Sequence, residues 1–217
     1  MKIVYTALLS MLVVLVCIFG DIPVNAEPHF SNETYNTVTI SPKDFTEDEI
    51  IQKAIIKVKV DKKESVYLMS PDEIYDYSYE CGRSDDLGET LRAIVYLESR
   101  FGEGGRIGDH GVARGITQVQ IPTAKFILKR LMGFEHTKFT TKEIKMLLTK
   151  NDRLCMIMSK IYLVYLMDQF QHKPSHWSHG LLSYNVGIGN VQKHGVVHDP
   201  NGYLDKARRF IQKTRGS

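Results

Sequence analysis

The stretch from Leu87 to Phe101 has the apolar spacing of an amphipathic helix, and one acidic residue lies on its apolar face. At about 100° per residue, this face carries Leu87, Leu91, Ile94 and Phe101. Glu98 falls among these side chains, so the helix directs a carboxyl group toward the core. Glutamate is rarely fully buried without a partner, because burial of an unpaired charge is costly. Any fold of this chain must therefore accommodate the carboxyl group at position 98.

Glycines at positions 102, 104, 105, 108, 111 and 115 predict that the helix ends near Phe101, which leaves Glu98 in its last turn. There the negative end of the helix dipole and partial desolvation both disfavour the ionised carboxylate and raise its pKa. Arg100 faces away and is not expected to cancel this shift. A carboxyl group that keeps its proton beside a glycine-rich loop is typical of a general acid. The alternative is a structural glutamate that a buried arginine or tyrosine hydroxyl satisfies.

Four segments carry a further pattern, and they occur in a fixed order along the chain. They are Glu98–Phe101 (ESRF), Ala113–Gln118 (ARGITQ), Thr123–Ala124 and Ser183–Val191 (SYNVGIGNV). Together they resemble the soluble lytic transglycosylases of the lysozyme-like superfamily, which cleave bacterial peptidoglycan. The resemblance lies within residues 81–217 and does not cover residues 1–80.

The resemblance implies a mainly α fold, a lysozyme-like transglycosylase domain with a short N-terminal lead-in. It implies that Glu98 is the catalytic residue, which acts first as acid and then as base to form a 1,6-anhydro-muramyl product. It places Tyr184 and Asn185 in the cleft opposite Glu98, where the Tyr184 hydroxyl can bond the Glu98 carboxyl group. Asn185 and Gln118 would offer amides to the acetamido groups of the substrate. No cofactor and no metal is implied.

The region around the glycine-rich loop departs from the family's pattern. Asp109 stands where the family commonly has serine, and Val112 stands where it usually has glycine. The proline that normally lies between the glutamine and the Thr-Ala pair is displaced to Pro122. These departures concern the floor of the expected cleft and its binding contacts, and they leave Glu98 unaffected.

Two other functions remain open from the sequence. A hydrolytic muramidase would admit water, and Asp109 or Glu103 would then supply the second carboxylate. A non-catalytic wall-binding scaffold would use Glu98 only as a buried structural acid. A domain of this kind also resembles the specialised transglycosylases that open the wall for a pilus, conjugation or secretion apparatus, although no residue identifies such a partner.

The first 26 of the 217 residues have the pattern of an export signal. Lys2 precedes an apolar run from Ile3 to Phe19, and Val24-Asn25-Ala26 is a small-residue cleavage site. We therefore expect a signal peptide at 1–26, a lead-in segment at 27–80 and the transglycosylase domain at 81–217, exported to the periplasm. The alternative is an uncleaved segment that tethers the protein to the inner membrane.

Composition and charge narrow the class of partner. The chain is 43% apolar and 24% charged, with a net charge of +3, as in soluble globular proteins. A mild positive charge favours an anionic polymer such as peptidoglycan glycan strands, but it is too small to indicate nucleic acid. Removal of the signal peptide leaves Cys81 and Cys155, which in an oxidising compartment form either a disulfide or two buried thiols.

Helix signals outside the central stretch predict the rest of the fold. We expect helices at about 46–60, from 70, at 123–132, 140–150, 151–170, 178–187 and 203–210. The helix at 151–170 is apolar on all sides and should form the buried centre. His172, His176 and His179 are not expected to bind metal, because Pro174 breaks the helix that would align them. Trp177 is expected to anchor the following helix.

Overall fold

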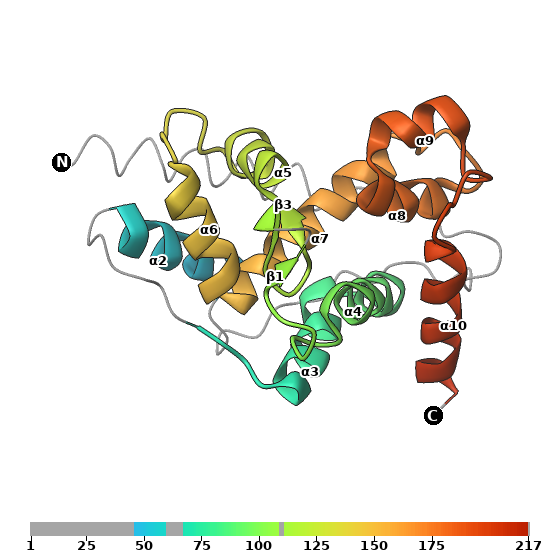
Figure 1. The fold of residues 1–217 in the computed structure, drawn as a ribbon, viewed down its shortest axis with the longest axis horizontal. Coiled ribbons are helices and arrows are strands. Elements are labelled where there is room, and N and C mark those ends of the chain that lie inside the picture. The colour runs from blue at the N-terminus through green and yellow to red at the C-terminus, as the bar shows by residue number, and fades with distance from the viewer. Residues whose placement is uncertain (1–45, 60–66, 109–110, 217) are drawn as a thin grey trace. The chain divides into compact units, whose positions relative to one another are not determined.

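The computed structural model describes residues 46–59, 67–108 and 111–216. These residues are mainly helical, which confirms the mainly α part of the predicted fold (Figure 1). The helices are α2 (Glu47–Lys59), α3 (Pro71–Gly82), α4 (Asp85–Ser99), α5 (Ile121–Phe126), the π-helix η2 (Ile127–Leu131), α6 (Thr141–Lys150), α7 (Asp152–Asp168), α8 (His176–Val186), α9 (Ile188–His194) and α10 (Tyr203–Arg215). The predicted signal peptide and the start of the lead-in lie outside the described residues. Within the described residues, no helix is long and apolar enough to cross a membrane.

Helix α7 is the buried centre of the fold, as its sequence predicted. Asn151 caps its first turn by accepting a hydrogen bond from the Leu154 N–H at 3.0 Å. Its buried apolar residues are Leu154, Cys155, Met156, Ile157, Met158, Leu163, Leu166 and Met167. Helices α3, α6 and α8 pack against it, because a helix that is apolar on all sides must be covered on all sides.

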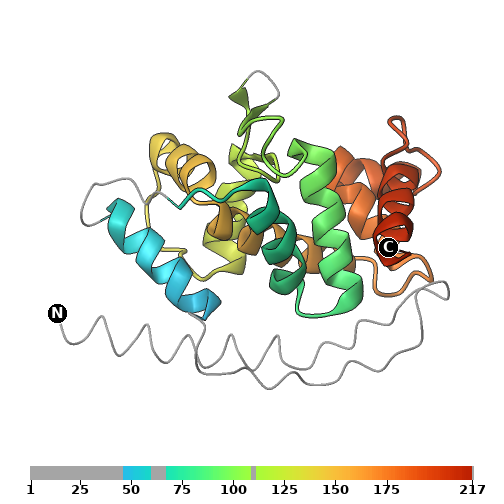
Figure 2. The same cartoon turned by 90° about the horizontal axis from the view of Figure 1, so that it is seen from below.

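The lead-in helices α2 and α3 belong to the same compact unit as α4 to α10. Helices α3 and α4 lie side by side (Figure 2). They approach so closely that a Cβ atom on Gly82 would lie 2.3 Å from the backbone nitrogen of Gly88. Helix α2 is joined to the unit by Glu47, which forms ion pairs with Lys160 and, at 3.3 Å, with Arg83. The boundary that we predicted between residues 80 and 81 falls inside α3.

The segment from 102 to 115, which we predicted as a loop, contains two very short strands. Strands β1 (Ile107–Gly108), β2 (Ala113–Arg114) and β3 (Val119–Gln120) form a small antiparallel sheet in the order β1-β2-β3. Two-residue strands leave no alternation for a sequence pattern to reveal, because the period-two signal needs at least four residues.

A buried ion pair ties this segment to α7. The Arg106 guanidinium donates to both carboxylate oxygens of Asp152, at 2.9 and 2.7 Å. Asp152 is fully buried and also accepts a hydrogen bond from the Met69 N–H at 2.9 Å. A buried carboxylate needs this complete set of donors, because its desolvation is otherwise not offset. The chain that follows Glu98 is thereby fixed to the centre of the fold.

Both cysteines are free, buried thiols, so the structure has the second of the two states that the sequence left open. The Cys155 sulfur lies 3.0 Å from the Thr117 hydroxyl. The Cys81 thiol lies instead near Lys160, whose positive charge acts to lower the pKa of Cys81. Cys155 and Lys160 lie about 140° apart around α7, at 100° per residue. The Cys155 thiol therefore points away from the face of α7 that is nearest Cys81, and burial raises its pKa to about 11.

Of the glycines between residues 102 and 115, Gly115 should tolerate an added side chain least. Its φ is +79°, and an added Cβ would lie 2.4 Å from the Cys155 sulfur and 2.5 Å from the Leu148 carbonyl oxygen. We expect Gly115→Ala to lower the free energy of unfolding by about 3 kcal/mol, from backbone strain plus overpacking. Urea denaturation followed by circular dichroism measures this loss.

Gly133→Ala is the matched control, because Gly133 has a similar φ of +73° and no heavy atom within 4 Å of an added Cβ. Gly133→Ala should lower the free energy of unfolding by only about 1 kcal/mol, which is the contribution of backbone strain alone. Equal losses in the two variants would show that crowding around Gly115 does not contribute.

Candidate functional site

Helix α4 ends within two residues of the predicted position, and its end sets the position of Glu98. The Ser84 hydroxyl caps the first turn by accepting from the Leu87 N–H at 3.4 Å. Arg100 and Phe101 have left-handed backbone angles, with φ of 49° and 56°, which terminate the helix. The Ser99 hydroxyl accepts a hydrogen bond from the Gly102 N–H at 3.0 Å and holds the turn that follows. Glu98 thus lies in the last turn of α4.

The Glu98 side chain is half-buried and has two hydrogen-bond donors. The Tyr203 hydroxyl donates to Glu98 Oε1 at 2.8 Å. The Asn185 side chain also donates to the carboxyl group. Desolvation raises the pKa of Glu98 above its usual value, and the bonds from Tyr203 and Asn185 oppose this rise without cancelling it. The group therefore holds its proton to a higher pH than an exposed glutamate.

Tyr203 is a residue of the candidate site that sequence reasoning missed. It is the first residue of α10, it is buried, and the Asp199 carboxylate fixes it by accepting from the N–H groups of Tyr203 and Leu204 at 2.8 and 2.9 Å. Burial and the nearby Glu98 charge raise the pKa of Tyr203 well above its usual value, so the phenol stays neutral and remains a donor. One signal was available: Tyr203 lies on the buried face of an amphipathic helix, and a buried hydroxyl requires a partner.

Tyr184 does not donate to Glu98, contrary to the expectation from the resemblance. Its hydroxyl bonds the Thr117 carbonyl oxygen and the Ser159 hydroxyl, both at 3.0 Å. Ser159 in turn donates to the Thr117 hydroxyl at 2.6 Å, and that hydroxyl contacts Cys155. Tyr184 therefore belongs to a buried hydroxyl network that joins α8, α7 and the turn before β3.

Tyr184 nevertheless lies close to the candidate acid. Burial is the main cause that raises its pKa, and the Glu98 charge adds to the rise. Asn185, the next residue, is exposed at the end of α8 and bonds Glu98 directly. The structure thus brings Glu98, Tyr184 and Asn185 together, with Tyr203 in the bonding role expected of Tyr184.

Gln118 lies in the turn between β2 and β3, with a left-handed φ of 50°. Its side-chain amide donates to the Gly115 carbonyl oxygen at 2.8 Å. Its amide oxygen packs against Gly108, where an added Cβ would lie 2.0 Å away. The amide that we expected to face substrate therefore helps to hold the small sheet together.

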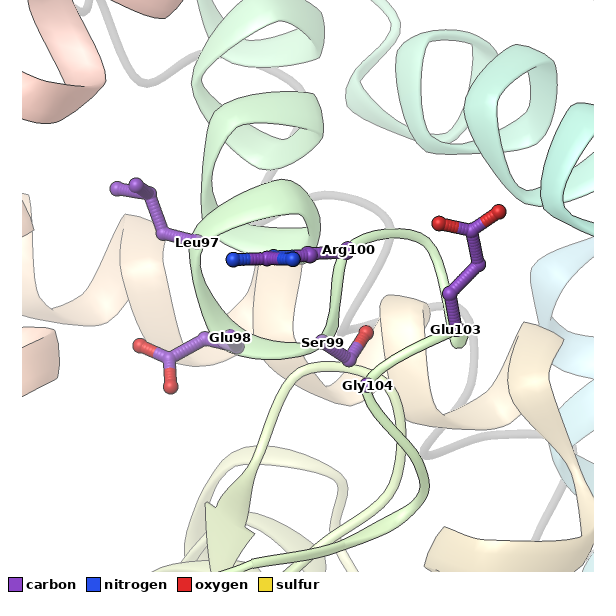
Figure 3. Close-up of a pocket in the computed structure, with 6 residues that line it drawn as sticks. All are labelled: Leu97, Glu98, Ser99, Arg100, Glu103 and Gly104. Atoms are coloured by element: carbon purple, nitrogen blue, oxygen red, sulfur yellow. The ribbon is translucent and has the colours of Figure 1, made fainter.

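A pocket of about 250 Å³ opens at the end of α4 (Figure 3). The residues that line it are Leu97, Glu98, Ser99, Arg100, Glu103 and Gly104. In Figure 3 the carboxyl groups of Glu98 and Glu103 project from opposite sides of the turn and point away from each other. Asp109, the other candidate for a second carboxylate, lies outside the described residues.

The histidine-rich segment has structural contacts. Among residues 46–59, 67–108 and 111–216, no group of three His, Cys, Asp or Glu side chains could hold a metal ion. The His179 ring lies 5.0 Å from the Phe170 ring and bonds the Ser175 carbonyl oxygen at 2.7 Å. Trp177 is buried and donates to the Thr90 hydroxyl at 2.9 Å, so it anchors α8 to α4 as predicted.

Comparison with models of protein families finds no matching family, and comparisons with curated proteins and with solved structures find no match. The class of the protein therefore follows from its fold and from the geometry of the candidate site. It is a mainly α-helical protein in which a half-buried carboxyl group, at the end of one helix, accepts hydrogen bonds from a tyrosine and an asparagine on two others.

Removal of the Tyr203 hydroxyl should raise the pKa of Glu98 further. The bond from Tyr203 stabilises the ionised carboxylate, so Tyr203→Phe leaves burial less opposed. A carbon-detected NMR titration of the Glu98 carboxyl group measures the shift. Tyr96→Phe is the control, because its ring stacking on Phe210 survives the substitution. A lower pKa in Tyr203→Phe would contradict the assigned role of this bond.

Glu98→Gln should stabilise the fold at pH 7 more than at pH 4. The folded-state pKa of Glu98 is raised, so between the unfolded value of 4.5 and the folded value the folded protein binds more protons. Stability therefore falls as pH rises through this window, and the loss is complete above the folded pKa. Glutamine removes this titration and can still accept from Tyr203. Urea denaturation of the wild type and of Glu98→Gln at pH 4 and pH 7 measures this difference. An equal change in the free energy of unfolding at both pH values would contradict the raised pKa of Glu98.

Proposed function

We propose that the protein is a peptidoglycan lytic transglycosylase of lysozyme-like architecture. The observation that carries the proposal is the Glu98 carboxyl group, whose burial raises its pKa while Tyr203 and Asn185 hold its orientation. A general acid needs a proton at working pH and a fixed geometry, and these contacts supply both requirements. The resemblance of the four sequence segments supports the choice of substrate.

In the first step, Glu98 donates its proton to the glycosidic oxygen between N-acetylmuramic acid and N-acetylglucosamine. The bond from the anomeric carbon to that oxygen breaks, and positive charge develops on the muramyl ring. Glu98 becomes a carboxylate, and the donors on Tyr203 and Asn185 stabilise this ionised form.

In the second step, the Glu98 carboxylate removes the proton from the muramyl C6 hydroxyl, and the oxygen attacks the anomeric carbon. A 1,6-anhydro ring forms, no water is consumed, and Glu98 is protonated again for the next cycle. One carboxyl group serves both steps because the nucleophile comes from the substrate.

The arrangement of the pocket favours this scheme over hydrolysis through Glu103. A two-carboxylate glycosidase places both groups across the bond that is cleaved, roughly 5 to 10 Å apart. Glu103 is exposed and points away from Glu98, so it is poorly placed to activate a water on the opposite face of the same sugar (Figure 3).

Export and partners form part of the same proposal. The signal-like pattern at 1–26 would deliver the protein to the periplasm, where glycan strands are its substrate, and an uncleaved segment would instead tether it to the inner membrane. Action within a pilus, conjugation or secretion apparatus is compatible with a single exported domain of this size.

Glu98→Gln should lower kcat on purified peptidoglycan by about 10² to 10⁴-fold, because the amide cannot donate the proton. Wild-type products should be lighter by one water than hydrolysis products in mass spectrometry. Glu103→Gln is the control, and it should keep its kcat and the same anhydro products. Products with only reducing-end muramic acid would replace the proposal with a muramidase, and full cleavage by Glu98→Gln would leave Glu98 a structural acid.

A further inference from the structure

Arg100 occupies an unfavourable backbone position at the end of α4. Its φ and ψ are 49° and 53°, in the left-handed region where a side chain is strained and glycine is the usual residue. Phe101, also left-handed, is accounted for by its packing against Tyr75, at a ring distance of 5.3 Å. The Arg100 side chain is exposed, so no such packing accounts for it.

A second arginine also ends a helix with a left-handed φ, and this arginine has an acidic partner. Arg83 ends α3 with a left-handed φ of 61° and forms an ion pair with Glu47 at 3.3 Å. Among the residues that the structure describes, no hydrogen bond or ion pair of the Arg100 side chain is found. Within the described part of the chain, the Arg100 guanidinium therefore remains available to bind an acidic ligand.

The place of Arg100 indicates what such a partner would be. Arg100 lines the same pocket of about 250 Å³ as Glu98. In Figure 3 its side chain runs across the end of α4 toward the side from which Leu97 and Glu98 project, whereas Glu103 projects from the other side. A guanidinium in this position can bind a planar acidic group with two parallel hydrogen bonds.

A simpler account is that a cation suits the negative end of the α4 dipole. Lysine or arginine would interact equally well with the helix dipole, and neither side chain would have to face the pocket to do so. The dipole account predicts that loss of Arg100 affects stability, while a binding role predicts that it affects ligand affinity. The two accounts can therefore be separated by experiment.

We infer that Arg100 is a carboxylate-binding residue of the Glu98 pocket and selects glycans that carry an acidic group beside the bond to be cleaved. The inference rests on the proposed function for the choice of glycan. In peptidoglycan the carboxylate belongs either to the lactyl group of muramic acid or to the peptide stem. A neutral polymer of N-acetylglucosamine has neither and would gain nothing from Arg100.

The test measures binding in a Glu98→Gln background, so that no ligand is cleaved. The three probes are glycan oligomers with peptide stems, the same oligomers after removal of the stems, and a neutral N-acetylglucosamine oligomer of equal length. Arg100→Gln should weaken binding of at least one acidic probe by about tenfold, as expected for a charge-assisted hydrogen bond near the surface. Affinity for the neutral oligomer should be unchanged, and the acidic probe that loses affinity identifies the source of the carboxylate.

Arg83→Gln is the matched control, because it removes the same charge from another left-handed residue at a helix end, outside the pocket. It should leave all three affinities unchanged. Arg100→Gly should bind like Arg100→Gln while keeping or gaining thermal stability, because glycine relieves the left-handed strain. A loss of stability without a loss of affinity would establish the dipole account instead.

The inference would be overturned if Arg100→Gln bound every probe as tightly as its Glu98→Gln parent does. It would also be overturned if the variant lost the same affinity for acidic and neutral probes. Neither result depends on catalysis. A wild-type protein that binds acidic glycans through Arg100 but does not cleave them would overturn the proposed function and leave the anion site standing.

Discussion

The desolvation of the Glu98 carboxyl group is the interaction on which the candidate site depends. Burial at the end of α4 favours the protonated form, and the donors on Tyr203 and Asn185 favour the ionised form. A group that is only buried would resist giving up its proton, and a group that is only hydrogen-bonded would ionise well below neutral pH. In the proposed mechanism Glu98 acts in turn as acid and base, and that role needs both influences in balance.

This balance depends on contacts far from the carboxyl group, because Tyr203 follows Glu98 by 105 positions in the sequence. Helix α10 packs along α4, and stacking of Tyr96 on Phe210 at 4.6 Å holds the two together near the site. At the other end of α10, the Thr214 hydroxyl bonds the buried Glu89 carboxylate at 3.0 Å. Each contact is modest, but together they fix the helix that places the Tyr203 hydroxyl, and small displacements weaken a hydrogen bond steeply.

The sequence predicted the parts of the fold that local rules govern. Helical periodicity and the following glycines placed Glu98 in the last turn of α4, and the helices expected at 140–150 and 151–170 match α6 and α7. The mainly α class followed from the same signals. Helix α9 and the continuation of α10 to Arg215 were not predicted, because propensity alone is a weak guide where tertiary packing decides a helix end.

The partners within the site could not be predicted in the same way. Periodicity shows that Tyr203 faces inward, but not which buried group its hydroxyl meets, because that depends on how α10 crosses α4. The resemblance pointed to Tyr184, which is close to Glu98 but is engaged by Thr117 and Ser159. A pattern can thus identify which tyrosines lie at a site, while the donor to the acid is decided by packing.

The buried hydroxyl network explains why Tyr184 is unsuited to the role of donor. Ser159 and Thr117 are fully buried, so each hydroxyl must find a partner inside the protein. If Tyr184 turned toward Glu98, the Thr117 carbonyl oxygen would lose its bond from Tyr184, at a cost of about 1 to 3 kcal/mol if it were left unpaired. The Ser159 hydroxyl would lose one bond but keep those to the Thr117 hydroxyl and the Cys155 carbonyl oxygen. Among the described residues, the partner of the Tyr203 hydroxyl is Glu98, so no contact within the core is lost when this hydroxyl donates to the carboxyl group. Which of the two tyrosines donates to Glu98 is therefore decided by which hydroxyl is already hydrogen-bonded within the core.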